Sequence, residues 1–289
     1  MCYHTPSSAG TGPADDDSER NTEMARTRRI KKEGDAHYHI TSRTNGRRFL
    51  FEDGKLKTEL VSTLWRAAEF CGVGLEAYAA MSNHFHVVAE VMKPESPVGE
   101  DELLRRVGVL RGERAKERLA KRWNRLRGAG READVEKEQD GLRARMHDVS
   151  EFVKLFKEEF DRIYKRGREH CGSIWAGRFS STIIQDGDYL ARCKRYVVYN
   201  PVRAGIVSQA KDYSWSWCDD EGRDAAYAGA VPGEWCLRRV AQIVAGKVLG
   251  SREFVMETVF SLGDRFRAGT GAHPVGDIGH STHGWRLAS

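Results

Sequence analysis

The 289-residue sequence predicts an α+β fold in which helices flank an antiparallel sheet. Residues 36–42 alternate in the manner of a strand. Residues 57–70 place most apolar side chains at helical spacing, and Gly72 follows as a stop signal. Residues 74–80 and 84–92 then predict two strands joined by a short turn. The order strand, helix, strand, strand favours packed α and β layers around an antiparallel sheet.

Further elements are expected beyond residue 149. Ser150 is a candidate N-cap, because a serine hydroxyl accepts a hydrogen bond from the first turn of a helix. The helix that follows carries one apolar stripe, formed by Phe152, Phe156, Phe160 and Ile163. Residues 172–184 predict a turn followed by a strand. A later helix is expected from about residues 186–188 to just before Pro201, since the residue before a proline disfavours the helical conformation.

Both ends of the chain differ from this core. The first 23 residues are acidic and rich in Ser and Gly, whereas the nine residues from Met24 hold five basic side chains. This abrupt reversal suggests Met24 as the natural start. Helical patterns recur over 235–249 and 251–267. The expected divisions are a disordered leader at 1–23, a basic arm at 24–35, a catalytic core at 36–217, a helical region at 218–267 and a flexible tail at 268–289.

Residues 93–149 are expected to be an insertion in the core, because their charge sets them apart. Positions 101–148 contain 14 Lys or Arg and 10 Asp or Glu, so half are charged, against 31% in the whole chain. We expect exposed helices with a hairpin turn at residues 128–130. A solvated insertion explains this composition, and a basic arm that binds nucleic acid is the alternative. The basic residues of that alternative are Arg105, Arg106, Arg111, Arg114, Lys121, Arg122, Arg125 and Arg127.

Composition excludes several classes of protein. Hydrophobic residues make up 40% of the chain, which is enough for a packed core. No apolar run approaches the length that spans a membrane. The six cysteines form no CxxC pair and match no zinc or disulfide spacing. The net charge of +5 permits a nucleic-acid partner without establishing one.

His84 and His86 are candidate metal ligands. Alternate residues of a strand share a face, so the two imidazoles point the same way while Phe85 packs behind them. His37 and His39 have the same spacing, so chance also produces such pairs. The His84/His86 pair alone is therefore a weak signal.

A tyrosine and an asparagine on the later helix complete the candidate site. Tyr196 and Asn200 are four residues apart and stack on one helical face. If that helix packs across the His84/His86 strand, Asn200 supplies an oxygen ligand to the ion. Tyr196 then reaches a phosphodiester whose oxygen the ion polarises. A core position is the alternative for Tyr196. The competing tyrosines are Tyr164, Tyr189 and Tyr199.

Five strings of residues occur in an order that resembles a known family. They are YHITSR, AYAAMSNHFHVV, GSIWAGRFSS, RYVVYNPVRAGIV and DYSWSW. Together they resemble the REP-associated branch of the single-tyrosine, insertion-sequence-200-like transposases, which belong to the HUH endonuclease superfamily. The resemblance covers about residues 36–217. Its strongest element is a tyrosine four residues before Asn-Pro-Val-Arg-Ala-Gly.

The resemblance implies a ferredoxin-like antiparallel sheet flanked by helices, here with a charged helical insertion and a C-terminal helical extension. It implies that His84, His86 and Asn200 hold Mg²⁺ or Mn²⁺. It also implies that Tyr196 attacks a phosphate of single-stranded DNA, forms a 5′-phosphotyrosine and releases a 3′-hydroxyl. The reverse reaction joins strands without external energy, because one phosphodiester is exchanged for another.

Basic residues near the proposed nucleophile are candidate DNA contacts. Arginines suit the forked recognition of phosphates, and an aromatic ring can stack on an unpaired base. A solvated or salt-bridged surface position is the alternative for each arginine. The candidates are Arg162, Lys165, Arg166, Arg168, Arg178, Arg192, Lys194, Arg195, Arg203 and Trp175.

The predicted function is metal-dependent cleavage and strand transfer at single-stranded, hairpin-bearing (REP-like) DNA. Two alternatives stay open: a non-catalytic regulator that binds DNA or RNA hairpins, and a metal-dependent hydrolase that forms no covalent adduct. We expect a cytoplasmic location, with nucleoid association through DNA, and no membrane partner. The sequence leaves open whether the protein is a monomer or a homodimer.

Overall fold

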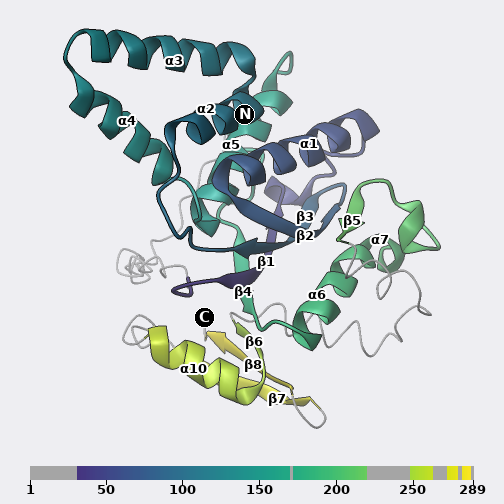
Figure 1. Ribbon diagram of the computed structural model, residues 1–289. Coiled ribbons are helices and arrows are strands. Elements are labelled where there is room, and N and C mark those ends of the chain that lie inside the picture. The colour runs from purple at the N-terminus through teal and green to yellow at the C-terminus, as the bar shows by residue number, and fades with distance from the viewer. Residues whose placement is uncertain (1–30, 170–171, 220–247, 263–271, 279–281, 288–289) are drawn as a thin grey trace, which may run out of the picture.

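The computed structural model describes residues 31–169, 172–219, 248–262, 272–278 and 282–287 (Figure 1). Within these residues, eight strands form one sheet in the order β5-β2-β3-β1-β4-β6-β8-β7. The expected leader, most of the basic arm and residues 235–247 of the helix expected over 235–249 lie outside the described residues. None of the described helices is both long enough and apolar enough to cross a membrane.

The centre of the fold is a βαββαβ unit. Its strands lie in the order β2-β3-β1-β4, and every neighbouring pair is antiparallel. This combination of chain order and strand order defines the ferredoxin-like arrangement, so the predicted fold class is confirmed. The elements of the unit are β1 (Ala36–Arg43), α1 (Gly54–Cys71), β2 (Val73–Ala80), β3 (His84–Val91), α5 (Val149–Lys165) and β4 (Ser180–Ile184).

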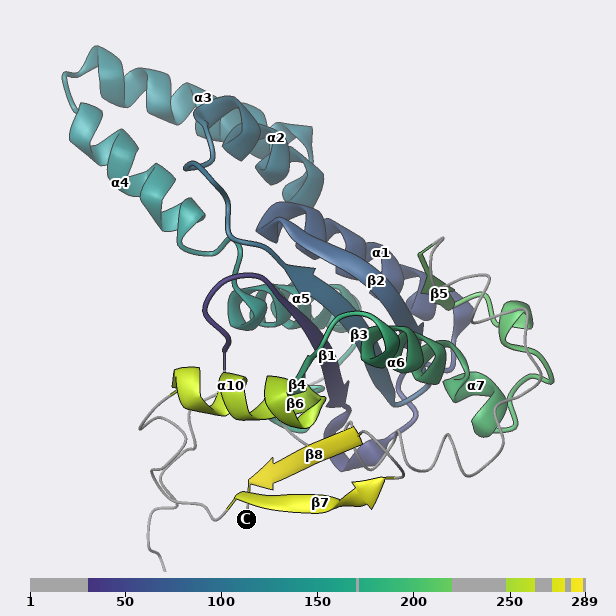
Figure 2. The same cartoon turned by 60° about the horizontal axis from the view of Figure 1, so that its bottom comes forward.

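Helices cover both faces of this unit (Figure 2). On one face, α1 and α5 pack on the larger cluster of buried side chains, which includes Ile40 of β1 and Phe85 of β3. On the other face, α6 (Asp188–Val198) packs through Cys193 and Val197 on a second cluster. Successive residues of a strand point to opposite faces. The neighbours of Ile40 and Phe85 in the sequence therefore point toward α6.

A bulge in β2 fits the sheet to α6. The register of β2 against β3 shifts between Leu75 and Ala77, so Glu76 is an extra residue in the ladder. Leu75, before the bulge, and Tyr78, after it, both join the cluster under α1 and α5. Ala77 and Ala79 face α6 and are fully buried. Their small side chains let α6 lie close to the sheet.

A buried ion network fixes α6 in place. The Lys194 ammonium lies 3.0 Å from Glu76 Oε1 and 2.7 Å from Asp219 Oδ2, and the residue is only 4% exposed. His37 Nδ1 lies 2.9 Å from Glu76 Oε2. Burial lowers the pKa of Lys194, but its hydrogen bonds to Asp219 and Glu76 raise it, and the net direction is upward. The cation therefore stays charged and joins α6 to β2 and to the end of β5 (Ser216–Cys218).

The cap of α5 differs from the prediction. Asp148, and not Ser150, is the N-cap, and its Oδ1 accepts hydrogen bonds from the backbone N–H groups of Ser150 and Glu151. A carboxylate here also complements the positive end of the helix dipole. Lys31 of the basic arm forms an ion pair with Asp148. This pair attaches the first described residue to α5.

The insertion is helical, as predicted. It contains α2 (Glu100–Arg111), α3 (Glu113–Gly128) and α4 (Glu132–Arg143). Helices α3 and α4 form a hairpin that projects from the sheet, and Gly130 in its turn has a φ of 72° (Figure 1).

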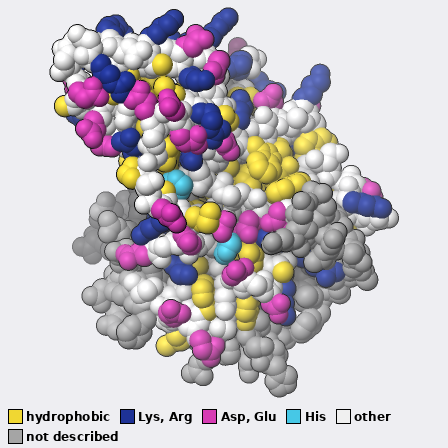
Figure 3. Space-filling view, in the orientation of Figure 1, with side chains coloured by type: hydrophobic (Ala, Val, Ile, Leu, Met, Phe, Trp, Pro, Cys, Tyr) yellow, Lys and Arg dark blue, Asp and Glu magenta, His cyan; other side chains and the backbone are white. Residues whose placement is uncertain are grey.

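Many charges of the insertion pair with one another. Basic and acidic side chains are interspersed on its surface (Figure 3). Arg122 lies 2.6 Å from Glu138, and Arg127 pairs with Glu100. The buried Trp123 donates its indole N–H to Glu138 at 3.0 Å. These contacts favour the solvated insertion over the basic arm.

The C-terminal region is a mixture of helix and strands. Its helix α10 (Arg252–Leu262) agrees with the pattern over 251–267, but β6 (Val248–Gly250), β7 (Ala272–Ile278) and β8 (Thr282–Leu287) were not predicted. The end of the helix expected over 235–249 and much of the tail expected to be flexible are therefore strands. Strand β6 pairs in parallel with β4, and β8 continues the sheet. Pairing with an existing sheet edge supplies backbone hydrogen bonds that leave little trace in the sequence of so short a strand.

Short helices complete the described elements. They are η2 (Asn45–Arg47), α7 (Asn200–Arg203) and η3 (Ala210–Asp212). Pro201 lies in the first turn of α7, where a missing backbone N–H costs nothing. Helix α6 ends at Val198, so the prediction that it stops before Pro201 is confirmed.

Trp175 is a core residue. It is 5% exposed, and its ring centroid lies 5.6 Å from those of Phe51 and Phe85. Its indole N–H donates to the backbone carbonyl of Lys157 at 3.3 Å. Trp175 lines a pocket beside α5, but it packs against aromatic side chains of the core, so little of its ring is exposed to stack on a DNA base.

Replacement of Trp175 tests this core assignment. Trp175→Ala should lower the free energy of unfolding by about 3–5 kcal/mol, because it leaves a large cavity. The matched control Phe49→Ala removes a ring that is 64% exposed and should change stability by less than about 0.5 kcal/mol. Urea denaturation followed by circular dichroism measures both. Equal losses in the two variants would contradict the core position.

Replacement of Lys194 tests the ion network. Lys194→Met should lower the free energy of unfolding by about 3 kcal/mol, since it leaves Glu76 and Asp219 without their buried cation. Arg192→Met, on the exposed side of the same helix, removes the same charge as a control and should have little effect. Thermal and urea unfolding are the measurements. A Lys194→Met protein as stable as the Arg192→Met protein would show that the network does not hold α6.

Candidate active site

Two histidines of β3 face α6. In the register of β3 against β1, His86 lies opposite Thr41 and His84 lies opposite Arg43. Between them, Phe85 points to the other face, where its ring centroid lies 5.1 Å from that of Phe156. The rings of His84 and His86 have centroids 5.1 Å apart. Strand alternation thus brings the two imidazoles together, as expected.

A third histidine, His39 of β1, completes the group. Its Nε2 lies 3.0 Å from His86 Nδ1, and the two rings are stacked with centroids 5.2 Å apart. Burial lowers the pKa of His39 to about 3 and the pKa of His86 well below its usual value. Both rings are therefore neutral near pH 7. In such a pair one ring donates and the other accepts.

Asn83 sets the orientation of His84. The Oδ1 atom of Asn83 lies 2.7 Å from His84 Nδ1. An amide oxygen only accepts, so His84 Nδ1 carries the proton and His84 Nε2 keeps a lone pair. Burial, together with the nearby Arg43, lowers the pKa of His84 to about 4. His84 is therefore a neutral imidazole with a free nitrogen available to a ligand.

Helix α6 brings Tyr196 to the histidines. Its buried stripe includes Leu190, Cys193 and Val197, which fixes how the helix is turned against the sheet. The Tyr196 ring meets His86 edge-on, with centroids 5.7 Å apart. It meets His39 in the same way at 6.0 Å.

Arg203 lies over the ring of this tyrosine. Its guanidinium carbon is 5.2 Å from the centroid of the Tyr196 ring, a cation–π contact. The positive charge of Arg203 is also among the causes of the lowered pKa of His86. Tyr196 itself is 7% exposed. A tyrosine, two neutral histidines and an arginine thus meet at one place.

Asn200 has a structural contact at the end of α6. Its side-chain Nδ2 donates to the backbone carbonyls of Tyr196 at 2.9 Å and of Val197 at 3.4 Å. This caps carbonyl groups that the last turn of a helix leaves without partners. The donor end of the amide is therefore used, while its Oδ1 atom is an acceptor of the kind that a divalent cation binds.

The donor set fits a divalent cation. His84 and His86 use Nδ1 for their contacts with Asn83 and His39, so each can offer Nε2 to an ion when His86 is the donor of its pair. In the part of the chain that the structure describes, no group of three or more His, Cys, Asp or Glu side chains is arranged to hold a metal. A third protein ligand to an ion bound here would have to come from another class of side chain, and the Asn200 amide oxygen has suitable chemistry.

A pocket of about 340 Å³ opens beside these histidines. Its lining combines basic, hydroxyl and amide side chains with the two imidazoles. The lining residues are Thr41, Ser42, Arg43, Arg47, Asn83, His84 and His86. The two arginines are exposed, so this pocket presents positive charge next to His84.

Sequence reasoning missed four of these residues as site candidates. The spacing of His39 with His37 is one that chance also produces, and the sequence analysis assigns no role to Arg43, Arg47 or Asn83. The signal that could have found His39 is the same alternation that placed His86, applied to a neighbouring strand. The hydrogen bond between His39 and His86 joins residues 47 positions apart. The sequence pattern does not show which residues of two strands come together.

Four predicted DNA contacts lie away from this site. They are Arg162, Lys165, Arg166 and Arg168. Helix α5 and the residues just after it carry them on the face of the sheet opposite α6, so the expectation that they surround Tyr196 is wrong. Arg162 lies 2.5 Å from Glu159, and Lys165 lies 2.5 Å from Asp161. Arg178 lines a separate pocket beside α5.

The remaining predicted contacts divide between surface and core. Arg192 is exposed on α6, and the guanidinium of the half-buried Arg195 lies 5.6 Å from the Tyr199 ring centroid. Lys194 is buried in its ion network, so the prediction that it contacts DNA is wrong. Arg203 alone of the predicted set contacts the Tyr196 ring among the described residues.

Comparisons with known proteins complete the description of the site. No family model matches the chain, and no curated protein matches it. A similar solved structure is that of a REP-associated tyrosine transposase bound to a REP hairpin. The alignment covers 71% of this chain and 87% of that chain, at 15% sequence identity and a TM-score of 0.43. At these values the similarity assigns neither a family nor an activity to this chain.

Proposed function

We propose that this protein cleaves single-stranded DNA and rejoins it through a covalent link to Tyr196. The observation that carries the proposal is the edge-on contact between the Tyr196 and His86 rings, 110 positions apart in the sequence. A nucleophile beside a candidate metal-binding pair and an arginine is an arrangement suited to phosphoryl transfer. The substrate class is hairpin-bearing DNA of the REP-like kind.

The covalent step is a transesterification. The Tyr196 oxygen forms a bond to the phosphorus of a DNA phosphodiester, and the bond from that phosphorus to the 3′ oxygen breaks. The tyrosine proton passes to water, and the leaving 3′ oxygen takes up a proton. The 5′ phosphate stays on Tyr196. Attack by a 3′-hydroxyl reverses the step, so strands are joined with no net loss of ester bonds.

The chain offers a binding place for Mg²⁺ or Mn²⁺ at this point. His84 Nε2, His86 Nε2 and the Asn200 amide oxygen would hold the ion. When bound, such an ion polarises a phosphoryl oxygen and lowers the barrier to attack. Asn83 keeps His84 in the required tautomer, and His39 does the same for His86 when it accepts the hydrogen bond from His86 Nδ1.

Arginines around the site bind and orient the DNA backbone. Arg43 and Arg47 line the pocket beside His84, and Arg203 lies against Tyr196. Guanidinium groups match phosphate oxygens in geometry and charge. Together they supply positive charge beside His84 and beside Tyr196.

The decisive experiment replaces the tyrosine hydroxyl. With Mg²⁺ or Mn²⁺, the wild-type protein should cleave a labelled single-stranded hairpin oligonucleotide and carry a covalent adduct visible as a mass shift. Tyr196→Phe should lose at least about 1,000-fold in cleavage rate and form no adduct, because a phenyl ring has no nucleophile. Tyr189→Phe, on the same helix, is the matched control and should cleave within about twofold of wild type.

The outcomes separate three functions. Cleavage by Tyr196→Phe at the wild-type rate contradicts the proposed mechanism. Turnover without an adduct would instead indicate a metal-dependent hydrolase. Tight hairpin binding with no cleavage by the wild type would indicate a non-catalytic regulator, a candidate that the near-complete burial of Tyr196 favours.

His39 is expected to act as a positioning residue for His86. His39→Leu removes the hydrogen bond to His86 Nδ1 and should weaken Mn²⁺ binding by about 10–100-fold. His37→Leu is the control, since it removes an imidazole from the same strand and face that contacts Glu76 instead. Isothermal titration calorimetry measures the affinity, and circular dichroism confirms that each variant is folded. Folded variants with equal Mn²⁺ affinity would contradict this role.

A further inference from the structure

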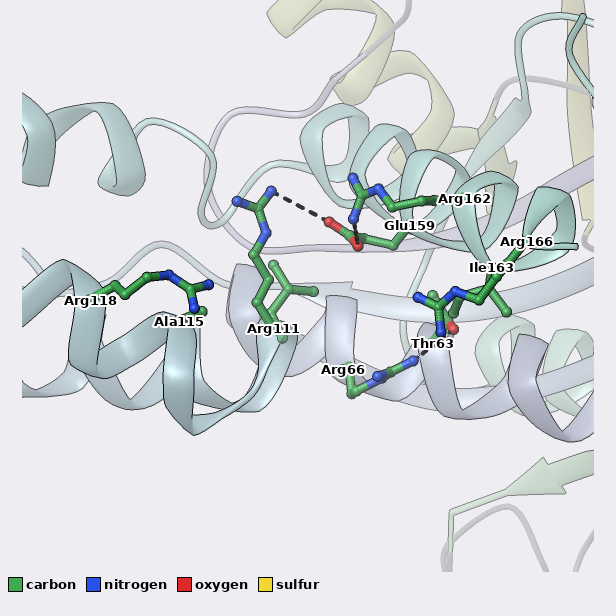
Figure 4. Close-up of a pocket in the computed structure, with 10 residues that line it drawn as sticks. Thr63, Arg66, Arg111, Ala115, Arg118, Glu159, Arg162, Ile163 and Arg166 are labelled. Carbon is green, nitrogen blue, oxygen red and sulfur yellow. Dashed lines mark hydrogen bonds and ion pairs between the residues drawn. The ribbon is translucent and has the colours of Figure 1, made fainter.

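A second pocket, of about 300 Å³, lies where the insertion meets the core (Figure 4). Helices α1 and α5 of the core form one part of it, and the end of α2 and the start of α3 form the other. The lining includes five arginines, namely Arg66, Arg111, Arg118, Arg162 and Arg166. Four of them lie on α1, α2, α3 and α5, Arg166 lies just after the end of α5, and all five line one cavity.

The charge of this pocket is strongly unbalanced. Glu159 is the one acidic residue in its lining. It lies 2.5 Å from Arg162 and 3.4 Å from Arg111, so its carboxylate serves two arginines at once. Among the described residues, no carboxylate pairs with Arg66, Arg118 or Arg166. Three guanidinium groups therefore keep their positive charge without an internal counter-ion.

One side-chain nitrogen of Arg66 has no hydrogen-bond acceptor among the described residues. Its side chain donates one hydrogen bond, from Nη2 to Thr63 Oγ1 at 3.0 Å. Its Nε atom is buried and has no hydrogen-bond partner among the described residues. The same residue lines the pocket, and its guanidinium has no acidic partner among the described residues.

We propose that this pocket binds a phosphate group. Guanidinium groups bind phosphate oxygens with paired, charge-assisted hydrogen bonds, and a cluster of them without counter-ions is typical of an anion site. The volume matches the lower end of small-ligand pockets, so it admits one or two phosphates with their neighbours. Two of the five arginines, Arg111 and Arg118, come from the insertion, so the site exists through the contact of insertion and core.

This site is distinct from the one at Tyr196. It lies beside α1 and α5, which cover the face of the sheet opposite α6. It does not depend on the proposed cleavage activity. The phosphate can belong to a nucleic-acid backbone or to a free nucleotide, and these two sources share the chemistry that the arginines recognise.

The test removes two arginines that have no carboxylate partner among the described residues. Wild-type protein is titrated with inorganic pyrophosphate at low salt by isothermal titration calorimetry. Arg118→Gln/Arg166→Gln should bind at least about tenfold more weakly, because two guanidinium groups are lost from the pocket. Arg114→Gln/Arg125→Gln removes the same charge from exposed positions of α3 outside the lining, and should bind within about twofold of wild type.

A second arm identifies the source of the phosphate. The same proteins bind a labelled single-stranded oligonucleotide without added divalent cations. If the nucleic-acid backbone is the source, the pocket variant alone loses DNA affinity and shows a shallower salt dependence. If a free nucleotide is the source, both double variants bind DNA equally and only pyrophosphate binding differs. Failure of the wild type to bind pyrophosphate, or equal loss in both double variants, overturns the proposal.

Discussion

The arrangement of the candidate site depends on the register between β1 and β3. With Thr41 opposite His86, the ring of His39 comes within hydrogen-bond distance of His86 Nδ1. Because β1 pairs with β4 on its other side, neighbours constrain it along both edges. A slip of one residue would turn every side chain of β1 to the opposite face. Tyr196 can contact both imidazoles only when β1 and β3 pair in this register.

The spacing of residues within single strands and helices predicted the features that depend on one element alone. Alternation along one strand was enough to set His84 and His86 on a common face, and helical spacing was enough to place Tyr196 on α6. The partner His39 could not be found in this way, because its role comes from pairing between strands. The burial of Lys194 could not be predicted from the sequence either, since a lysine in an amphipathic helix is usually at the surface.

The insertion illustrates the same limit for charged residues. Its sequence predicts exposed helices, and the structure contains them, but sequence does not tell which arginine meets which glutamate. Arg122 and Arg127 have acidic partners, whereas Arg118 on the same helix has none among the described residues. The difference arises from how the hairpin lies on the core. Arginines of one helix can therefore pair with acidic side chains at one place and form a positively charged pocket at another.

The extra residue in β2 has a consequence for how the gene can change. Glu76 interrupts the alternation of side chains along β2. Leu75 and Tyr78, three positions apart, therefore point to the same face of the sheet. Deletion of the Glu76 codon would restore simple alternation and leave Leu75 and Tyr78 on the face that they now share. It would remove the carboxylate that binds Lys194 of α6. The strand ladder can therefore close without Glu76, and its ion pair with α6 is the contact that such a deletion would destroy.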